Sequence, residues 1–216
     1  MAGMHTVKQG EYIALIAAQY GFSNWQDIWN LPQNSALKNQ RQNPNVLCPG
    51  DQVYVPDLEV KNTPKPTDNT HKFTLTTTTL KLRLTLQDMY EKPIANAKCV
   101  LSLNGNTINV TTDGSGNITQ TIPSTTQNGV LVILDSQTPF NNVQIPLLVG
   151  GLDPVTEVSG QKTRLQNLGY ALDVAGSPGD DGLESAVEEF QCDNGLTVDG
   201  ICGPVTQAKL KQVYGC

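Results

Sequence analysis

The spacing of apolar residues changes twice along the chain, and these changes constrain the fold more than any other feature of the sequence. Near the start, Ile13, Ile16 and Ala17 recur at three- and four-residue intervals, the pattern of a helix with one buried face. Leucines then alternate with polar residues from 80 to 87, which is typical of a strand. Helical spacing returns in residues 151–216. The sequence therefore predicts a multidomain α+β protein in which two helix-containing units flank a β unit.

The first unit, residues 1–57, is expected to have a β-α-α-β order. Strand patterns at 5–7 and 52–55 enclose two helical segments, the second of which carries Trp25 and Trp29. The four-residue spacing of the tryptophans favours a place in the core over a role as stacking platforms for a sugar.

This unit resembles the LysM domain, a module that binds N-acetylglucosamine polymers such as peptidoglycan and chitin. The matching features are the turn at Gly10 and the Asn-Pro-Asn motif at 43–45, although the segment 23–42 is longer than in the family. The resemblance implies a glycan-binding groove between two lips; the alternative is that Gly10 and Pro44 are only turn residues. The lips are Gln9, Gly10, Glu11 and Tyr12 on one side and Asn43, Asn45, Val46 and Leu47 on the other.

A polar linker with prolines, residues 58–72, is expected to hold the first unit apart from the β unit. The β unit, residues 73–150, is predicted to be an antiparallel β-sandwich, because short strand patterns alternate with turns such as Asn-Gly at 104–105. Its Pro-Ile-x-Asn-Ala stretch and its Thr-Asp-x-x-Gly turn resemble the transthyretin-like or carboxypeptidase-regulatory-like sandwich family. That resemblance implies a spacer or interaction module rather than a catalyst.

The last unit, residues 151–216, is predicted to be a bundle of three short helices. An Asp-Pro cap at 153–154 starts the first helix, which ends at Gly169. The second helix spans about 183 to 192, and the third begins at Pro204.

Three motifs of this bundle resemble the peptidoglycan-binding domain found on many wall hydrolases. They are Leu-Gly-Tyr after the first helix, Ala-Val-x-x-Phe-Gln in the second and Asp-Gly-Ile-x-Gly-Pro-x-Thr before the third. The family's first Asp-Gly-x-Phe-Gly turn is replaced here by the segment 176–182. The resemblance implies a ligand groove, whereas the Asp-Gly and Gly-Pro pairs alone would be ordinary turn signals. The groove would be bordered by Tyr170, Gln191, Asp199, Ile201 and Gly203.

Charge and cysteine usage narrow the range of partners. The net charge is −6, and residues 151–216 carry 4 basic and 10 acidic side chains, so nucleic acid and anionic membranes are poor partners. No apolar run approaches the ~20 residues needed for membrane insertion. Five cysteines cannot all pair within one chain. Cys192 and Cys202 flank a turn and could close a disulfide, with reduced thiols as the alternative.

Catalysis is the rival interpretation, and the residue types present speak against it. The two histidines, His5 and His71, cannot build a zinc centre based on paired histidines. Cys99 lies in a strand pattern without a glycine-rich elbow, and the glutamates of the second C-terminal helix fit a solvated face. The turn at 113–117 lacks the acidic closing ligand of a calcium loop. We expect no enzymatic activity, no metal and no cofactor.

We therefore predict a non-enzymatic cell-wall protein that binds peptidoglycan, through its N-acetylglucosamine-containing glycan and its stem peptide. The first residues lack the n- and h-regions of a signal peptide, so we expect a cytoplasmic protein exported by a non-classical route to the periplasm or wall. The N-terminal unit resembles LysM proteins associated with bacterial contractile injection systems of the type VI secretion kind. This implies an adaptor or cargo component that contacts a secretion-apparatus or effector protein. The alternatives are a peptidoglycan hydrolase with an unrecognised catalytic centre and a structural baseplate protein of a phage-tail-like particle.

Overall fold

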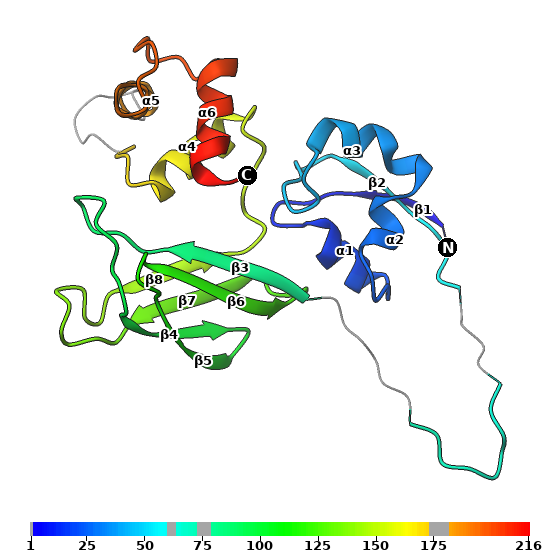
Figure 1. Ribbon diagram of the computed structural model, residues 1–216. Helices are drawn as coiled ribbons and strands as arrows, with labels where there is room; N and C mark the ends of the chain where they lie inside the picture. Colours follow the sequence, from blue (N-terminus) through cyan, green and yellow to red (C-terminus); the bar gives the residue numbers. More distant parts are fainter. Residues whose placement is uncertain (1, 60–63, 73–78, 173–181) are drawn as a thin grey trace. The chain divides into compact units, whose positions relative to one another are not determined.

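The computed structural model describes residues 2–59, 64–72, 79–172 and 182–216 (Figure 1). The predicted start of the β unit at 73, linker residues 60–63 and nearly all of the segment 176–182 lie outside the described residues.

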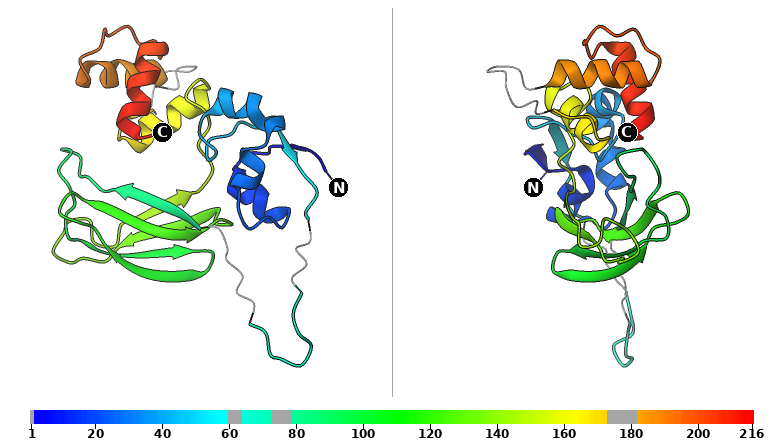
Figure 2. Two further views of the ribbon diagram at one scale, coloured as in Figure 1. Left: turned by 45° about the vertical axis from the view of Figure 1, so that its right-hand side comes forward. Right: turned by 90° about the vertical axis from the view of Figure 1, so that its left-hand side faces the viewer.

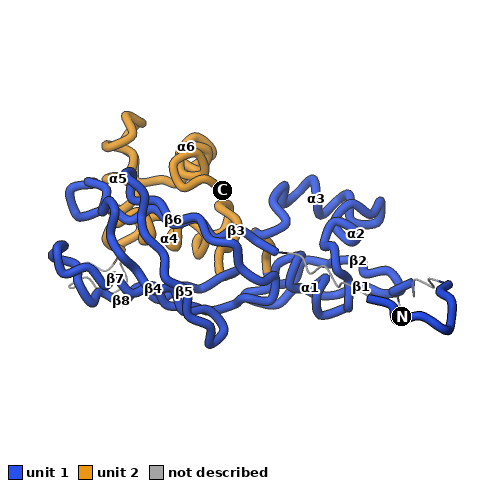
Figure 3. Tube along the Cα trace, turned by 60° about the horizontal axis from the view of Figure 1, so that its bottom comes forward, with its two compact units in different colours: residues 1–45, 49–150 blue, residues 46–48, 151–216 orange. Residues whose placement is uncertain are grey.

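The described residues form a mixed α+β protein with an N-terminal β/α region, antiparallel sheets in the middle and a C-terminal helical region. This arrangement confirms the predicted fold class. The chain divides into two compact units, one of residues 1–45 and 49–150 and the other of residues 46–48 and 151–216 (Figure 3). In the described part of the chain, every helix is too short or too polar to cross a bilayer.

The N-terminal region of the first unit begins and ends with short strands that pair with each other. β1 (Gly3–Thr6) runs antiparallel to β2 (Gln52–Val55), with His5 opposite Val53. Between them lie α1 (Ile13–Gln19), α2 (Gln26–Trp29), the 3-10 helix η1 (Pro32–Asn34) and α3 (Ser35–Arg41). The strands and the first two helices agree with the sequence patterns, whereas η1 and α3 occupy a segment for which the sequence predicted no element.

A buried asparagine, Asn34, explains how this middle segment is held in place. Its side-chain amide donates hydrogen bonds to the backbone oxygens of Ile28 and Tyr54, at 2.8 and 2.9 Å, and its side-chain oxygen accepts one from the Tyr54 N–H at 2.8 Å. Because buried polar groups are stable when they are hydrogen-bonded, Asn34 ties α2 and β2 together at the start of α3. Trp29 lies in the core, as predicted, while Trp25 is half-buried.

In the middle region, the six described strands β3 to β8 form two antiparallel sheets. One sheet pairs β3 (Thr79–Thr85) with β6 (Asn117–Pro123), and the other has the order β5 (Asn106–Thr111), β4 (Lys98–Leu103), β7 (Asn128–Ile133) and β8 (Gln144–Leu148). The sheets face each other across a shared apolar core, so they form a sandwich (Figure 2). Leu80, Leu82 and Leu84 pack against this core and Lys81 and Arg83 are exposed, which confirms the predicted alternation.

A two-residue turn joins β4 to β5, as the Asn104-Gly105 pair predicted. Both residues have positive φ, 47° and 81°, and Leu103 pairs with Asn106 on either side of them. Turns of this kind match the twist of the strands that they join. β7 lies between β4 and β8 and is therefore a central strand.

In the described part of the second unit there are three helices, α4 (Val158–Asn167), α5 (Leu183–Asp193) and α6 (Pro204–Tyr214), and α5 runs across α6 (Figure 2). The predicted start of the first helix is wrong, because α4 begins at Val158 and not at Pro154. The Glu157 N–H donates to the Pro154 oxygen at 2.9 Å and closes a turn instead. A Cβ atom at Gly160 would clash with the carbonyl oxygens of Asp153 and Pro154, so this turn packs directly against α4.

One arginine is buried beside the apolar core of this unit. Arg164 is 1% exposed, and its guanidinium donates to the backbone oxygens of Asp153, Gly160 and Cys216 at 2.9, 2.7 and 2.9 Å. Hydrogen bonds from a charged donor are strong, and these three satisfy a group that would otherwise be costly to bury. Arg164 therefore ties the segments before and after the helices to α4.

Candidate functional site

The loop between α5 and α6 is organised by one buried side chain, Gln191. Its Nε2 donates to Asp199 Oδ1, the Ile201 backbone oxygen and Thr206 Oγ1, at 2.8, 3.1 and 3.0 Å. Its Oε1 accepts from the backbone N–H groups of Asp199 and Gly200, at 3.0 and 3.1 Å. Gln191 is 1% exposed. Both polar atoms of the amide are thus used to hold the loop in one conformation.

Gly200 allows this loop to lie against α5. Its φ is +69°, and a Cβ atom there would lie 2.7 Å from Glu184 Cγ. Any larger residue would strain the backbone and push the loop away from the helix. Glu184, Glu188 and Glu189 are exposed, which confirms the solvated helix face expected for them.

The loop presents an exposed apolar edge with a carboxylate beside it. Val198, Ile201 and Val205 are 52, 66 and 71% exposed. The hydrogen bond from Gln191 and those from backbone N–H groups lower the pKa of Asp199, so its carboxylate stays ionised. Apolar surface next to a few fixed polar groups is the composition of a small-ligand site. The apolar side chains of this edge can contact the methyl groups of a peptide or an acetylated sugar. The Asp199 carboxylate can accept hydrogen bonds from the N–H or O–H groups of the same ligand.

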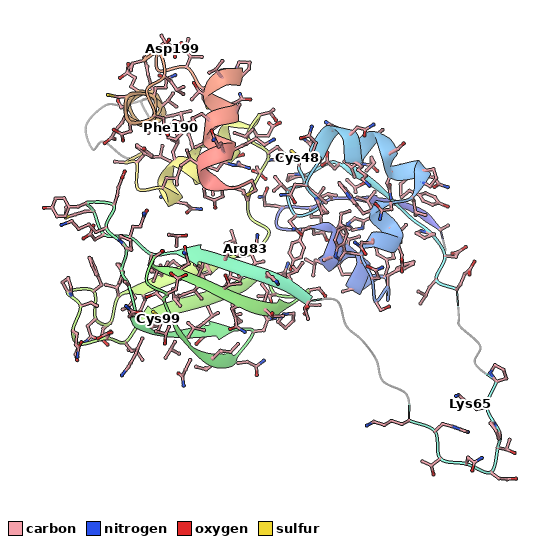
Figure 4. All side chains as sticks on the ribbon, in the orientation of Figure 1. Cys48, Lys65, Arg83, Cys99, Phe190 and Asp199 are labelled. Carbon is pink, nitrogen blue, oxygen red and sulfur yellow. The ribbon has the colours of Figure 1, made fainter. Side chains whose placement is uncertain are left out.

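The five residues predicted for this unit therefore fall into two sets. Gln191, Asp199, Ile201 and Gly203 belong to one loop, in which Gly203 is the N-cap of α6. Tyr170 is half-buried instead, with its ring edge-on to Phe190 at 5.6 Å and its hydroxyl donating to Asp193 Oδ2 at 3.1 Å. Figure 4 labels Phe190 and Asp199, which mark these two places on the helical unit. Ligand contact by any of the five stays a prediction.

The first N-terminal lip is held largely by contacts within the protein. Glu11 is 9% exposed and accepts from the Lys8 N–H and from His5 Nε2, both at 2.8 Å. Burial raises the pKa of Glu11, but the hydrogen bonds from Lys8 and His5 outweigh it, so the pKa lies below its usual value. Gln9 is exposed and Gly10 is half-buried with φ +83°.

Tyr12, the last residue of that lip, points into the sandwich. It is 1% exposed, and its hydroxyl donates to the backbone oxygens of Ser124 and Thr126 at 3.0 and 2.6 Å. Burial raises the pKa of Tyr12 to about 12. A glycan could reach the hydroxyl only if this contact opened. This contact could not be predicted from local sequence patterns, because the partners lie 112 and 114 residues further along the chain.

Residues 43–45 of the second lip lie next to the first lip. The Ile13 N–H donates to the Pro44 oxygen at 3.0 Å, and Asn43 Oδ1 accepts from the Asn45 N–H at 2.9 Å. Asn45 is exposed. Val46 and Leu47 are 7 and 4% exposed, so little of either side chain meets solvent. The glycan groove between the lips and its contacts stay predictions.

Cysteines and acidic residues form no centre of another kind in the described ranges. No group of three His, Cys, Asp or Glu side chains there could hold a metal ion. Cys192 and Cys202 are free thiols in this structure, with Cys192 exposed on α5 and Cys202 packed against the apolar core; a disulfide between them stays a prediction. In the turn at 113–117, Asp113 Oδ1 accepts from the N–H groups of Ser115 and Asn117, both at 2.8 Å, so the carboxylate stabilises the turn itself.

Comparison with known families found a match for the segment that contains the C-terminal loop. Residues 155–210 match the family model described as "Putative peptidoglycan binding domain". The match covers α4, α5 and most of α6, and it contains all five residues predicted for this unit. The same comparison with family models identified no LysM domain and no other domain in this chain. Comparisons with curated proteins and with solved structures gave no match. The function supported at this level is peptidoglycan binding by the C-terminal unit.

Proposed function

We propose that this protein is a non-enzymatic cell-wall-binding protein that contacts peptidoglycan with the apolar edge of the α5–α6 loop. The observation that carries the proposal is the five-hydrogen-bond anchorage of this loop by Gln191, within the segment that matches the peptidoglycan-binding family. A loop fixed before binding loses little conformational entropy when the ligand arrives. The exposed edge can therefore contribute most of its contact energy to affinity.

The N-terminal lips support a second wall contact. They lie side by side through the Ile13–Pro44 hydrogen bond, and their sequence resembles the LysM domain. Two wall-affinity sites on one chain make the second contact intramolecular, which raises retention on a polymer without any new contact. This favours the role of an adaptor or cargo component that stays on the wall, exported with an injection system of the contractile type.

Co-sedimentation with purified sacculi tests the proposed contact. Ile201→Ser removes apolar surface from the centre of the edge, and the lost burial of roughly 1 kcal/mol predicts about fivefold weaker retention. Val158→Ser is the matched control, because Val158 is 54% exposed on α4, outside this loop. We expect the control to sediment like the unchanged protein. Equal retention of the two variants on sacculi would show that the α5–α6 loop is not part of the peptidoglycan-binding surface.

A further inference from the structure

A cavity of about 170 Å³ lies inside the first unit, where the lips meet the sandwich. Tyr12 and Asn45 line it from the N-terminal region, and β3, β6 and residues 149–150 line it from the sandwich. Sites for drug-sized ligands usually occupy ~300–1,000 Å³. This cavity is therefore of a size for one substituent of a single sugar, and an oligosaccharide would extend out of it.

The walls of the cavity are fixed by packing. Tyr12 is anchored by its two hydrogen bonds to the sandwich, and the cluster to which it belongs packs against Leu80 and Val149. Gly150 has φ +83°, and a Cβ atom there would lie 2.5 Å from Tyr12 Cδ1 and 2.7 Å from the Gly10 oxygen. Such close approach requires glycine. The lip and the sandwich consequently form one continuous wall.

The chemistry of the lining combines three kinds of group. Leu80, Leu82 and Val149 supply apolar surface, and the exposed Asn45 amide can both donate and accept a hydrogen bond. Lys81 also lines the cavity, and its side chain lies on the exposed side of β3, opposite to the two leucines. In the described part of the chain, no hydrogen bond or ion pair engages the Lys81 ammonium. Apolar surface, an amide and a cation together suit an acetamido group and a carboxylate on one ligand.

We propose that this cavity binds an N-acetylated amino sugar that carries a carboxylate, with the acetamido methyl against the leucines and the carboxylate at Lys81. The inference rests on the proposed function for the source of the ligand, since peptidoglycan contains such a sugar, N-acetylmuramic acid. The site is shared between the N-terminal region and the sandwich, so neither contains it alone. Lys81 makes it selective, because an uncharged N-acetyl sugar gains nothing from the cation.

The test compares N-acetylmuramic acid with N-acetylglucosamine, which has the same acetamido sugar ring but lacks the 3-O-lactyl ether and therefore its carboxylate. Each is titrated into the full chain, and the amide signals of Asn45 and Gly150 are followed by NMR. An exposed ion pair predicts about two- to fivefold tighter binding of N-acetylmuramic acid. Lys81→Gln should abolish this preference. Arg83→Gln is the matched control, because Arg83 lies on the same exposed side of β3 and does not line the cavity (Figure 4).

Three outcomes would overturn the inference: equal affinity for the two sugars, absence of any shift at Asn45 and Gly150, or loss of the preference in both variants. The last would mean that charge alone attracts the sugar to the strand. Sacculus retention through the α5–α6 loop is measured separately with Ile201→Ser. If the sugars fail to bind the cavity as predicted while the unchanged protein still sediments with sacculi and Ile201→Ser sediments less, only this inference is refuted. If Ile201→Ser sediments as well as the unchanged protein, the proposed function is refuted.

Discussion

Replacing Gln191 by methionine keeps the volume of the side chain and removes all five of its hydrogen bonds. Asp199 is an exposed residue, so we expect water to replace the hydrogen bond that its carboxylate loses. Thr206 is 5% exposed, and the Ile201 oxygen and the N–H groups of Asp199 and Gly200 lose partners at a part-buried position. At about 1 kcal/mol for each bond that water does not replace, the second unit should lose about 2–4 kcal/mol of unfolding free energy. That is a large part of the ~5–15 kcal/mol of a typical domain.

Hydrogen exchange by mass spectrometry resolves this effect within the full chain. Peptides that cover residues 183–214 should exchange faster in Gln191→Met by a factor that corresponds to the lost free energy. Both tryptophans, Trp25 and Trp29, lie in the first unit, so the denaturant midpoint of their fluorescence should stay unchanged. Gln166→Met is the control, because Gln166 is exposed on α4 and should change stability by less than about 0.5 kcal/mol. Unchanged protection in residues 183–214 would refute the role assigned to Gln191.

Three further substitutions test contacts that stabilise each unit from within. Tyr12→Phe leaves the Ser124 and Thr126 oxygens without their donor, so the tryptophan-monitored unfolding free energy should fall by about 1–3 kcal/mol. Tyr20→Phe, at a 43% exposed position, is the control and should change this free energy far less. Equal effects of the two substitutions would contradict the role of the Tyr12 hydroxyl as an anchor. Glu11→Gln should destabilise the first unit at neutral pH, because a carboxyl pKa that is lowered by folding adds stability above the unfolded pKa of about 4.5. In the unchanged protein this stability is lost as the pH falls through the folded pKa, so the variant should lose less stability on acidification. Identical pH profiles of the two proteins would contradict this. Arg164→Met leaves three carbonyl oxygens without a donor, so the protection of α4 against hydrogen exchange should fall by about 2–4 kcal/mol. An effect no larger than that of Gln166→Met would show that the Arg164 guanidinium is not needed for the stability of the second unit.

Features set by neighbouring residues were predicted well from the sequence. The alternation around Lys81 and Arg83 gave the exposed side of β3, and Asn104-Gly105 gave the hairpin, because each depends on backbone geometry within a few residues. The position of α5, expected at about 183 to 192 and observed at Leu183–Asp193, followed from helical spacing in the same way.

Features set by distant contacts were not predicted. The Asp-Pro pair is a valid helix-start signal, but the packing of Gly160 against Pro154 turns the chain before α4 begins. Asn34 looks like a surface residue in the sequence, and only its bonds to α2 and β2 show why it is buried. Tyr12 was expected at a glycan lip, yet its partners lie in the sandwich.

The C-terminal site shows the same division between local and distant information. Its motifs lie within the segment that matches the peptidoglycan-binding family model, and they could be recognised because turn residues and helix caps are local signals. The sequence could not separate Gln191, which positions the loop, from Ile201, which is exposed on it, since both are close together in the motif. Burial and hydrogen bonding distinguish the two roles.

Binding without cleavage is tested most directly by measuring retention and hydrolysis in the same sample. Purified full-length protein is incubated with sacculi, the pellet is assayed for protein, and the supernatant is assayed for soluble muropeptides. Retention of the protein in the pellet, with no more muropeptide in the supernatant than from sacculi alone, is the result that we predict. Release of muropeptides by the unchanged protein would contradict it, as would failure of the protein to sediment with the sacculi.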